Sequence, residues 1–137
     1  MDRAVVASIP LFGRLSPEEQ ERVAAAARTI HFEAGEPIVY EGEFSFDFYA
    51  LTNGAAEVRH GDEHVADLHA GDVVGEMGVV RPESGRWTRR RGATVVATAP
   101  TDAIEIAGDD FRGLTEAIPA LAGALHDLSS ERAPAEP

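Results

Sequence analysis

Two short stretches of this chain carry residues whose types and spacing could bind an anion. In the first, residues 73–80, an apolar pair leads into Gly75, Glu76 and Gly78. A helix that starts at such a glycine leaves its first backbone N–H groups unpaired, and these groups attract anions. Glycine also lets a ligand approach the backbone closely, because it has no side chain. The second stretch, residues 91–95, opens with an arginine, whose planar set of donors suits phosphate oxygens. Together the two stretches predict a phosphate site.

The joined stretches resemble the phosphate-binding cassette of cyclic-nucleotide-binding domains, the family of catabolite activator proteins and protein kinase A regulatory subunits. In that pattern a hydrophobic residue precedes Gly-Glu, and Arg-x-Ala-Thr-Val or its serine form follows after a loop. The resemblance implies that Arg91 holds the cyclic phosphate and that the Glu76 carboxylate accepts a hydrogen bond from the ribose 2′-OH. It also implies that backbone amides near Gly78 and Gly92 bind phosphate oxygens. The ligand-binding residues that it predicts are Gly75, Glu76, Met77, Gly78, Arg91, Gly92, Ala93 and Thr94.

The ligand implied by the resemblance is cAMP or cGMP, with cAMP favoured, and no other cofactor is expected. Members that select cGMP often carry a hydroxyl just after the phosphate arginine, and here that position is Gly92. Two plainer interpretations stay open. Glu76 could be a surface carboxylate that caps a short helix, and Arg91 could be a residue at the rim of a barrel paired with an acid.

The loop between the two stretches departs from the family pattern. Glu76 and Arg91 are fifteen positions apart, more than the family usually allows, and residues 82–88 look like an insertion. Of the twelve basic residues, all arginine, five fall at positions 81–91, and outside Arg91 these suit a solvated loop. Trp87 could stack on a purine, cover the phosphate or anchor the loop. This loop favours an alternative: a fold that no longer binds nucleotide and acts as a protein-interaction module.

Composition limits the remaining possibilities. With 137 residues, 44% of them hydrophobic, the chain suits one domain, predicted at residues 1–130, followed by a flexible tail at 131–137. A net charge of −12 argues against direct binding to DNA, whose phosphates would repel an acidic surface. The chain has no cysteine and no apolar run of membrane-spanning length, so we expect a cytoplasmic protein that does not bind membranes.

Local patterns predict a mainly β fold with flanking helices. Ser16 and Glu19 form a capping-box pattern around Pro17, which predicts a helix that runs to about Arg28. From position 29 onward, short apolar runs alternate with glycines, as in an antiparallel barrel or sandwich. Asn53-Gly54 and Gly61-Asp62 are plausible hairpin turns. The resemblance implies that these strands form the family's antiparallel jelly-roll β-barrel, with an N-terminal helix and C-terminal helices.

The C-terminal region is predicted to hold two helices, one after Gly108 and one from Pro119. An apolar stripe on the second helix needs a partner, which could be the barrel, a second copy of the chain in a homodimer, or an effector protein. By resemblance, the C-terminal helices shift as a lid over the base when the ligand binds. The residues concerned are Ile118, Leu121, Leu125 and Leu128 for the stripe and Phe111, Leu121 and Leu125 for the lid.

Histidines suggest a third possibility, a metal-dependent cupin enzyme. His60, His64 and His69 are spaced by four and five positions, but a turn at Gly61 separates the first two and no His-x-His pair occurs. We therefore expect solvated or turn histidines and no metal. Spacing also singles out no catalytic residues, so the chain is not expected to be an enzyme.

Overall fold

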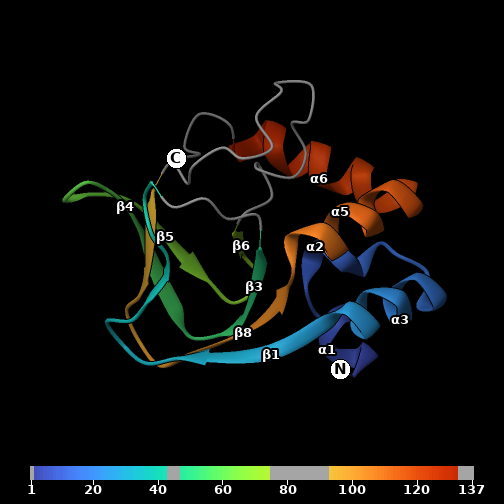
Figure 1. Ribbon diagram of the computed structural model, residues 1–137, viewed down its shortest axis with the longest axis horizontal. Helices are drawn as coiled ribbons and strands as arrows, with labels where there is room; N and C mark the ends of the chain where they lie inside the picture. Colours follow the sequence, from blue (N-terminus) through green and yellow to red (C-terminus); the bar gives the residue numbers. More distant parts are fainter. Residues whose placement is uncertain (1, 43–46, 75–92, 133–137) are drawn as a thin grey trace.

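The computed structural model describes residues 2–42, 47–74 and 93–132, and these residues define the fold. Their strands form two antiparallel four-stranded sheets, which lie beside a layer of helices (Figure 1). The first sheet has the order β1 (Ala27–Phe32), β8 (Thr101–Ile106), β3 (Phe48–Asn53), β6 (Val73–Val74). The second sheet has the order β2 (Pro37–Val39), β7 (Thr94–Ala97), β4 (Ala55–His60), β5 (Glu63–His69).

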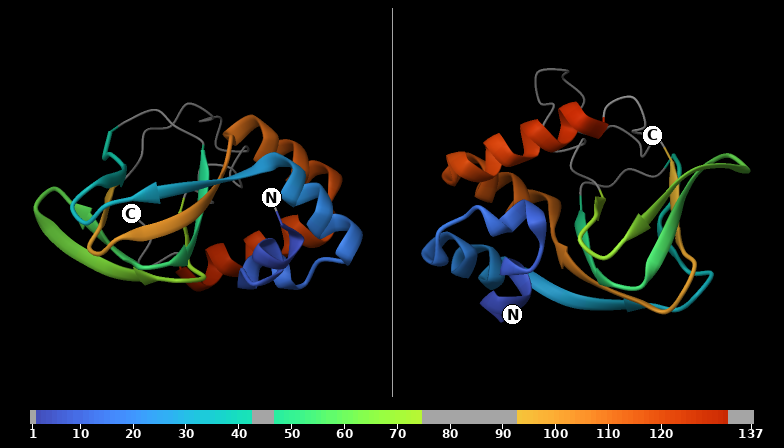
Figure 2. Two further views of the ribbon diagram at one scale, coloured as in Figure 1. Left: turned by 90° about the horizontal axis from the view of Figure 1, so that it is seen from below. Right: turned by 180° about the vertical axis from the view of Figure 1, so that it is seen from behind.

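The helices from both ends of the chain gather on one side of the sheets (Figure 1 and Figure 2). They are α1 (Arg3–Ala7), α2 (Pro10–Gly13), α3 (Pro17–Ala26), α5 (Gly108–Ala117) and α6 (Pro119–Arg132). In this layer α2 contacts α6 and α3 contacts α5, so the N-terminal and C-terminal helices form one unit. No helix of the described segments combines the length and the apolar character needed to cross a membrane.

The start of α3 confirms the capping-box prediction. The Ser16 hydroxyl accepts a hydrogen bond from the Glu19 N–H at 3.1 Å, and the Glu19 carboxylate accepts one from the Ser16 N–H at 2.9 Å. The helix ends at Ala26, earlier than the sequence indicated. Its end is set by pairing far along the chain, because Ala27 and Arg28 already belong to β1 and lie opposite β8.

Residues of β3 and β8 alternate between two hydrophobic clusters. On one side of the first sheet, Phe48 and Ile104 pack with the helices, in what we call the helix-side cluster. On the other side, Tyr49 and Leu51 pack with residues of the second sheet, in the inter-sheet cluster. This alternation follows from the two-residue repeat of a strand. The first sheet therefore separates the helices from the space between the sheets.

Aromatic stacking fixes α5 on the first sheet. The rings of Phe48 and Phe111 are stacked with centroids 4.1 Å apart and planes 8° apart, and Phe12 meets Phe48 edge-on at 5.8 Å. Leu121 and Leu125 of α6 are fully buried in the same helix-side cluster. The three residues expected to close over a base therefore lie on the helix side of the first sheet, facing away from the inter-sheet cluster.

The two expected hairpin turns have different outcomes. Gly61-Asp62 joins β4 to β5, whose residues pair directly up to His60 and Glu63, so that prediction is confirmed. The prediction for Asn53-Gly54 is wrong, because β3 pairs with β8 and β6, whereas β4 belongs to the second sheet. At Gly54 the chain crosses from one sheet to the other with φ +93°.

The predicted fold class is confirmed. The described strands are antiparallel, helices flank them at both ends of the chain, and the strand order is that of a jelly roll. Within the described segments the strand pairs make two facing sheets instead of one closed barrel.

Candidate functional site

Most of the predicted ligand-binding residues lie outside the described segments. Positions 75–92 contain Gly75, Glu76, Met77, Gly78, Arg91 and Gly92, together with the long loop and Trp87. Their roles stay predictions. The structure does describe Ala93, Thr94 and the residues on both sides of positions 75–92.

The chain on either side of positions 75–92 leads into different sheets and contributes to the same cluster. Val74 ends β6 and lies opposite Tyr49 in the first sheet. Thr94 begins β7 and lies opposite Arg59 in the second sheet. Val74 and Ala93 are both buried in the inter-sheet cluster. The two halves of the predicted cassette are therefore attached on opposite sides of the space between the sheets.

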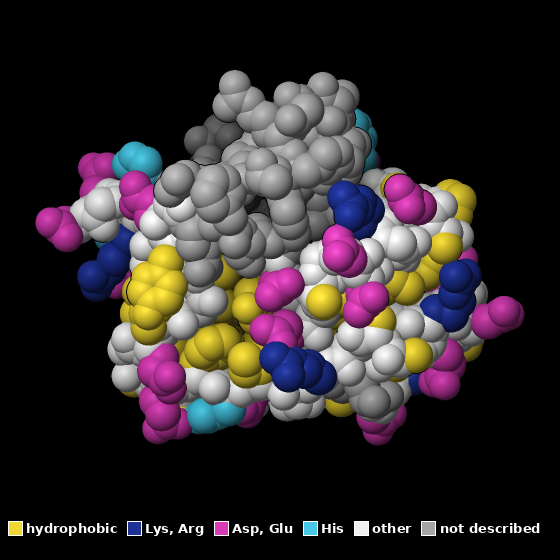
Figure 3. All heavy atoms as spheres, in the orientation of Figure 1, with side chains coloured by type: hydrophobic (Ala, Val, Ile, Leu, Met, Phe, Trp, Pro, Cys, Tyr) yellow, Lys and Arg dark blue, Asp and Glu magenta, His cyan; other side chains and the backbone are white. Residues whose placement is uncertain are grey.

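Apolar side chains from both sheets pack together between them. Tyr49 and Val74 contribute from the first sheet, and Val58 and Leu68 contribute from the second. Just beyond β2, the aromatic side chain of Tyr40 is 56% exposed. Sequence reasoning missed it, because no pattern distinguishes an exposed aromatic from a buried one near the end of a strand. On the face shown in Figure 3, hydrophobic side chains gather over the strands with acidic side chains around them.

Thr94 ties the start of β7 to the chain that follows β2. Its hydroxyl oxygen accepts a hydrogen bond from the Glu41 N–H at 2.9 Å. This bond uses a lone pair of the hydroxyl and leaves its proton free to be donated. Ala93 is buried and has no polar side-chain group. Of the two described site residues, only Thr94 could therefore use its side chain as a hydrogen-bond donor to a ligand.

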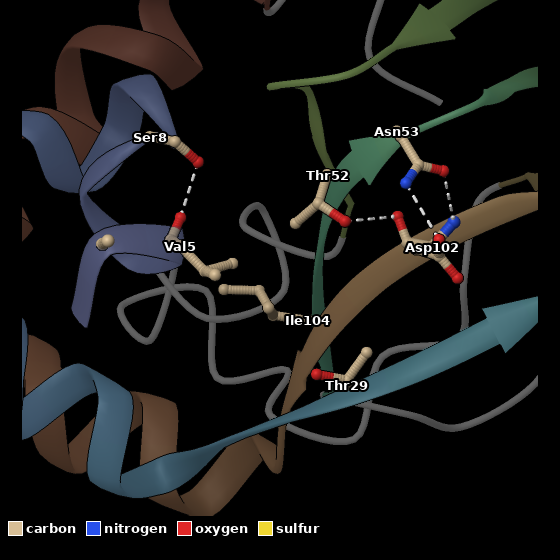
Figure 4. A pocket seen from close by; sticks show the side chains of 8 residues that line it. Val5, Ser8, Thr29, Thr52, Asn53, Asp102 and Ile104 are labelled. Atoms are coloured by element: carbon tan, nitrogen blue, oxygen red, sulfur yellow. Dashed lines mark hydrogen bonds between the residues drawn. The ribbon is translucent and has the colours of Figure 1, made fainter. Parts of the chain in front are cut away.

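A pocket of about 550 Å³ lies on the helix side of the first sheet (Figure 4). Val5 of α1 and Ser8, which directly follows this helix, form one wall, and residues of β1, β3 and β8 form the other. Polar groups of both walls are already paired. The Thr52 hydroxyl donates to the Asp102 carbonyl at 3.0 Å, and the Ser8 hydroxyl donates to the Val5 carbonyl at 2.6 Å. This pocket is separated from the inter-sheet cluster by the first sheet, so it is not the space that the cassette residues flank.

The titratable groups around Asp102 form an exposed network. Asp102 binds the His31 ring nitrogen Nδ1 at 2.7 Å and accepts a hydrogen bond from the Asn53 side-chain amide at 2.9 Å. The hydrogen bonds of His31 to Asp102 and to Glu33 raise the pKa of the imidazole above its usual value. The hydrogen bonds from His31 and Asn53 lower the pKa of Asp102. The network ties β1, β8 and the end of β3 together and is exposed to solvent.

The fold and the cassette sequence together define the class of this protein. The family model for the cyclic nucleotide-binding domain matches residues 29–117, which span the strands of both sheets and α5. The chain belongs to this family. It is a cyclic-nucleotide-binding domain homologous to the regulatory subunits of cAMP-dependent protein kinases.

Two fungal relatives illustrate the homology. The cAMP-dependent protein kinase regulatory subunit of Mycosarcoma maydis is 30% identical over 129 residues, which are 90% of this chain and 23% of that protein. The corresponding subunit of Emericella nidulans is 32% identical over 116 residues, which are 83% of this chain and 27% of that protein. The chain thus spans about a quarter of the length of these relatives.

Solved structures show the same fold. A regulatory subunit of a cAMP-independent protein kinase A from Trypanosoma brucei superposes with a TM-score of 0.78 and 25% identity, covering 93% of this chain and 44% of that one. The catabolite activator protein of Thermus thermophilus superposes with a TM-score of 0.74 and 26% identity, covering 90% of this chain and 57% of that one. The jelly-roll expectation is therefore confirmed.

Proposed function

We propose that this chain is a regulatory domain that binds a 3′,5′-cyclic nucleotide, preferably cAMP, between its two sheets. The observation that carries the proposal is the attachment of the cassette. Val74 and Ala93, which flank positions 75–92, are buried in the same cluster; Val74 ends β6 of the first sheet, and Ala93 directly precedes β7 of the second sheet. A ligand held by the cassette would therefore lie beside the apolar side chains that both sheets contribute to the inter-sheet cluster. The relatives named as cAMP-dependent regulatory subunits support cAMP as the ligand.

Each cassette residue would contact the part of the nucleotide that suits its charge. Arg91 would neutralise the cyclic phosphate, and the backbone amides near Gly78 and Gly92 would donate hydrogen bonds to its oxygens. Glu76 would accept a hydrogen bond from the ribose 2′-OH, since a carboxylate placed beside the phosphate would repel it. The base would lie against the apolar side chains of the inter-sheet cluster. No step of bond making or breaking is needed, so we propose that the domain is not an enzyme.

Binding would be transmitted to the C-terminal helices through the first sheet. The cassette follows β6, which pairs with β3 at Tyr49 and Ala50. The neighbouring residue on β3, Phe48, faces the helices and stacks on Phe111 of α5. A shift of β6 would therefore act on the residue that anchors α5. The ligand can move this equilibrium only by the difference between its affinities for the two arrangements.

The C-terminal helix needs no second chain to bury its described apolar residues. Leu121 and Leu125 are fully buried within this chain, in the helix-side cluster. Of the three partners considered for the apolar stripe, the chain's own core covers these two leucines. An effector protein that reads a shift of α6 fits this arrangement better than a homodimer through the same leucines. The homodimer and the absence of direct DNA binding stay predictions.

The main alternative is a domain that has this fold but binds no nucleotide. The Trypanosoma brucei relative is the regulatory subunit of a kinase described as cAMP-independent, and it shares this fold. The insertion at residues 82–88 is the feature of this chain that would suit such a role. In that case the domain would act as a protein-interaction module.

Isothermal titration calorimetry with cAMP and with cGMP separates these possibilities. We expect one site on the wild-type chain, with cAMP bound more tightly than cGMP. Arg91→Ala should weaken binding by about 2–5 kcal/mol, because it would leave the phosphate without the opposite charge that pairs with it. Arg14→Ala is the matched control, since Arg14 is exposed in the helical layer and pairs with Asp127. If neither nucleotide gives heat or a thermal shift at millimolar concentration, the ligand-binding proposal fails and the interaction module is favoured.

A further inference from the structure

We propose that Glu57, His64 and Asp67 form a surface site for a divalent transition metal, with Zn²⁺ as the representative ion. The three residues lie on the hairpin of β4 and β5, in the second sheet. Among the described residues, their ligand atoms form a group in which each atom lies within 4.8 Å of the others. This site does not depend on the proposed nucleotide site.

Strand register places these three side chains on one face of the hairpin. Glu57 lies between Ala56 and Val58, which are buried in the inter-sheet cluster, so Glu57 points outward. Asp67 is the residue directly opposite Glu57 on β5. Both carboxylates therefore lie on the outer surface of the second sheet.

An irregularity in the hairpin brings His64 to the same face. Val58 pairs with Ala66, but the next residue, Arg59, pairs with His64, so one residue of β5 is passed over. Such a bulge changes which residues share a face of the strand. Without it, Arg59 would pair with Val65, and His64 would be turned toward the opposite side. The bulge thus places the His64 imidazole on the same face of the hairpin as the two carboxylates.

The distances among the ligand atoms suit a single ion after small side-chain rotations. His64 Nε2 is 2.9 Å from Asp67 Oδ1 and 4.0 Å from Glu57 Oε2. Two ligands that each lie about 2.0–2.1 Å from a tetrahedral Zn²⁺ are roughly 3.3 Å apart. To bind one ion, His64 Nε2 must therefore move slightly away from Asp67 Oδ1 and slightly closer to Glu57 Oε2. The side chains of His64 and Asp67 are 51% and 63% exposed and have room to adjust. The Glu57 side chain is only 16% exposed, so its position is more restricted.

The charge arrangement also favours a cation at this place. Carboxylates directly opposite each other on neighbouring strands repel, and this destabilises the pair. Arg59 contacts Glu57 through Oε1, which leaves Oε2 directed toward His64. Arg59 already offsets the charge of Glu57, so a cation bound by Glu57 Oε2, His64 Nε2 and Asp67 Oδ1 would neutralise the negative charge that remains on the pair of carboxylates. One imidazole, two carboxylates and open positions for water make a donor set that Zn²⁺ accepts, whereas Ca²⁺ takes oxygen ligands.

The test is calorimetric titration of the whole chain with ZnCl₂, with CaCl₂ as a comparison. We expect one Zn²⁺ site and no heat from Ca²⁺ at the same concentrations. His64→Ala and Asp67→Asn should each weaken Zn²⁺ binding at least about tenfold. Circular dichroism on both variants checks that the fold is kept, which we expect because both side chains are largely exposed.

The matched control is His126→Ala. His126 is an exposed histidine of α6, outside the hairpin, so its removal should leave Zn²⁺ affinity unchanged. A second readout is the imidazole NMR signal of His64, which Co²⁺ should broaden before the signals of the other histidines. The proposal is overturned if the wild type binds no Zn²⁺, if His64→Ala binds it as tightly as the wild type, or if His126→Ala loses as much affinity as His64→Ala.

Discussion

Replacing Gly54 with alanine should strongly destabilise the chain, because this residue is where the polypeptide passes from the first sheet to the second. Its φ of +93° is a conformation that L-residues rarely adopt. A Cβ at this position would also lie 2.6 Å from the Pro100 carbonyl oxygen and 2.7 Å from the Thr101 Cα. Both of these are backbone atoms, so neither can rotate away. Thr101 is fully buried and its hydroxyl donates to the Ala55 carbonyl at 3.0 Å, which fixes the surroundings further.

The size of the effect follows from two contributions. The positive φ alone costs an alanine about 1–2 kcal/mol. Forcing a methyl group into a filled site adds about 1–3 kcal/mol. Gly54→Ala should therefore lower the free energy of unfolding by roughly 2–5 kcal/mol. Gly35→Ala is the matched control, since Gly35 has nearly the same φ of +92° but nothing within 4 Å of the added Cβ. The stability that Gly35→Ala loses should be limited to the cost of the positive φ.

Urea unfolding followed by far-UV circular dichroism measures both variants. A chain of this size is expected to unfold in a single cooperative transition, so the midpoints convert to free energies. Equal losses in Gly54→Ala and Gly35→Ala would refute the steric part of the reasoning, because only the close approach to Pro100 and Thr101 distinguishes the two positions.

Three further predictions concern the elements around the site. Phe111→Ala should lower the free energy of unfolding by about 3–5 kcal/mol in urea denaturation, because it empties a fully buried position stacked on Phe48; a loss below 1 kcal/mol would contradict the packing. Ser16→Ala should cost about 1 kcal/mol in the same assay, since it removes the capping hydrogen bond of α3, and an unchanged midpoint would contradict that role. The pKa of His31 is raised by its pairing with Asp102, so this pairing stabilises the fold fully below the ordinary imidazole pKa of about 6.5. The stabilisation is lost as the pH rises through the raised pKa of His31. In His31→Asn, unfolding at a series of pH values should show a smaller fall in stability above pH 6.5, and an unchanged fall would count against the pair.

Local chemistry made some elements predictable from the sequence. The capping box of α3 needs only Ser16 and Glu19, three positions apart, and both of its hydrogen bonds are formed. The turn at Gly61-Asp62 is also local, since it joins strands that pair with each other. The order of glycines and apolar runs predicted an antiparallel barrel or sandwich, and the family resemblance implied a jelly roll, which is confirmed by the strand order and by the solved structures.

Long-range pairing explains what the sequence did not show. The end of α3 is set by the pairing of Ala27 and Arg28 with β8, some eighty positions further along the chain. Asn53-Gly54 has the composition of a hairpin turn, but composition does not reveal that the next strand joins the other sheet. The spacing of His64 gave no hint of Glu57, because the two meet only through the register of β4 and β5. The cassette residues themselves lie outside the described segments, so their roles rest on the family.

The location of the ligand is best tested by titrating the isotope-labelled chain with cAMP and following its backbone amide NMR signals. Binding between the sheets should shift the signals of Val74, Ala93 and Thr94, which flank the cassette, and should leave Ser8 and Thr29 in the helix-side pocket unchanged. Shifts confined to Ser8 and Thr29, or an unchanged spectrum at millimolar cAMP, would contradict a nucleotide site between the two sheets.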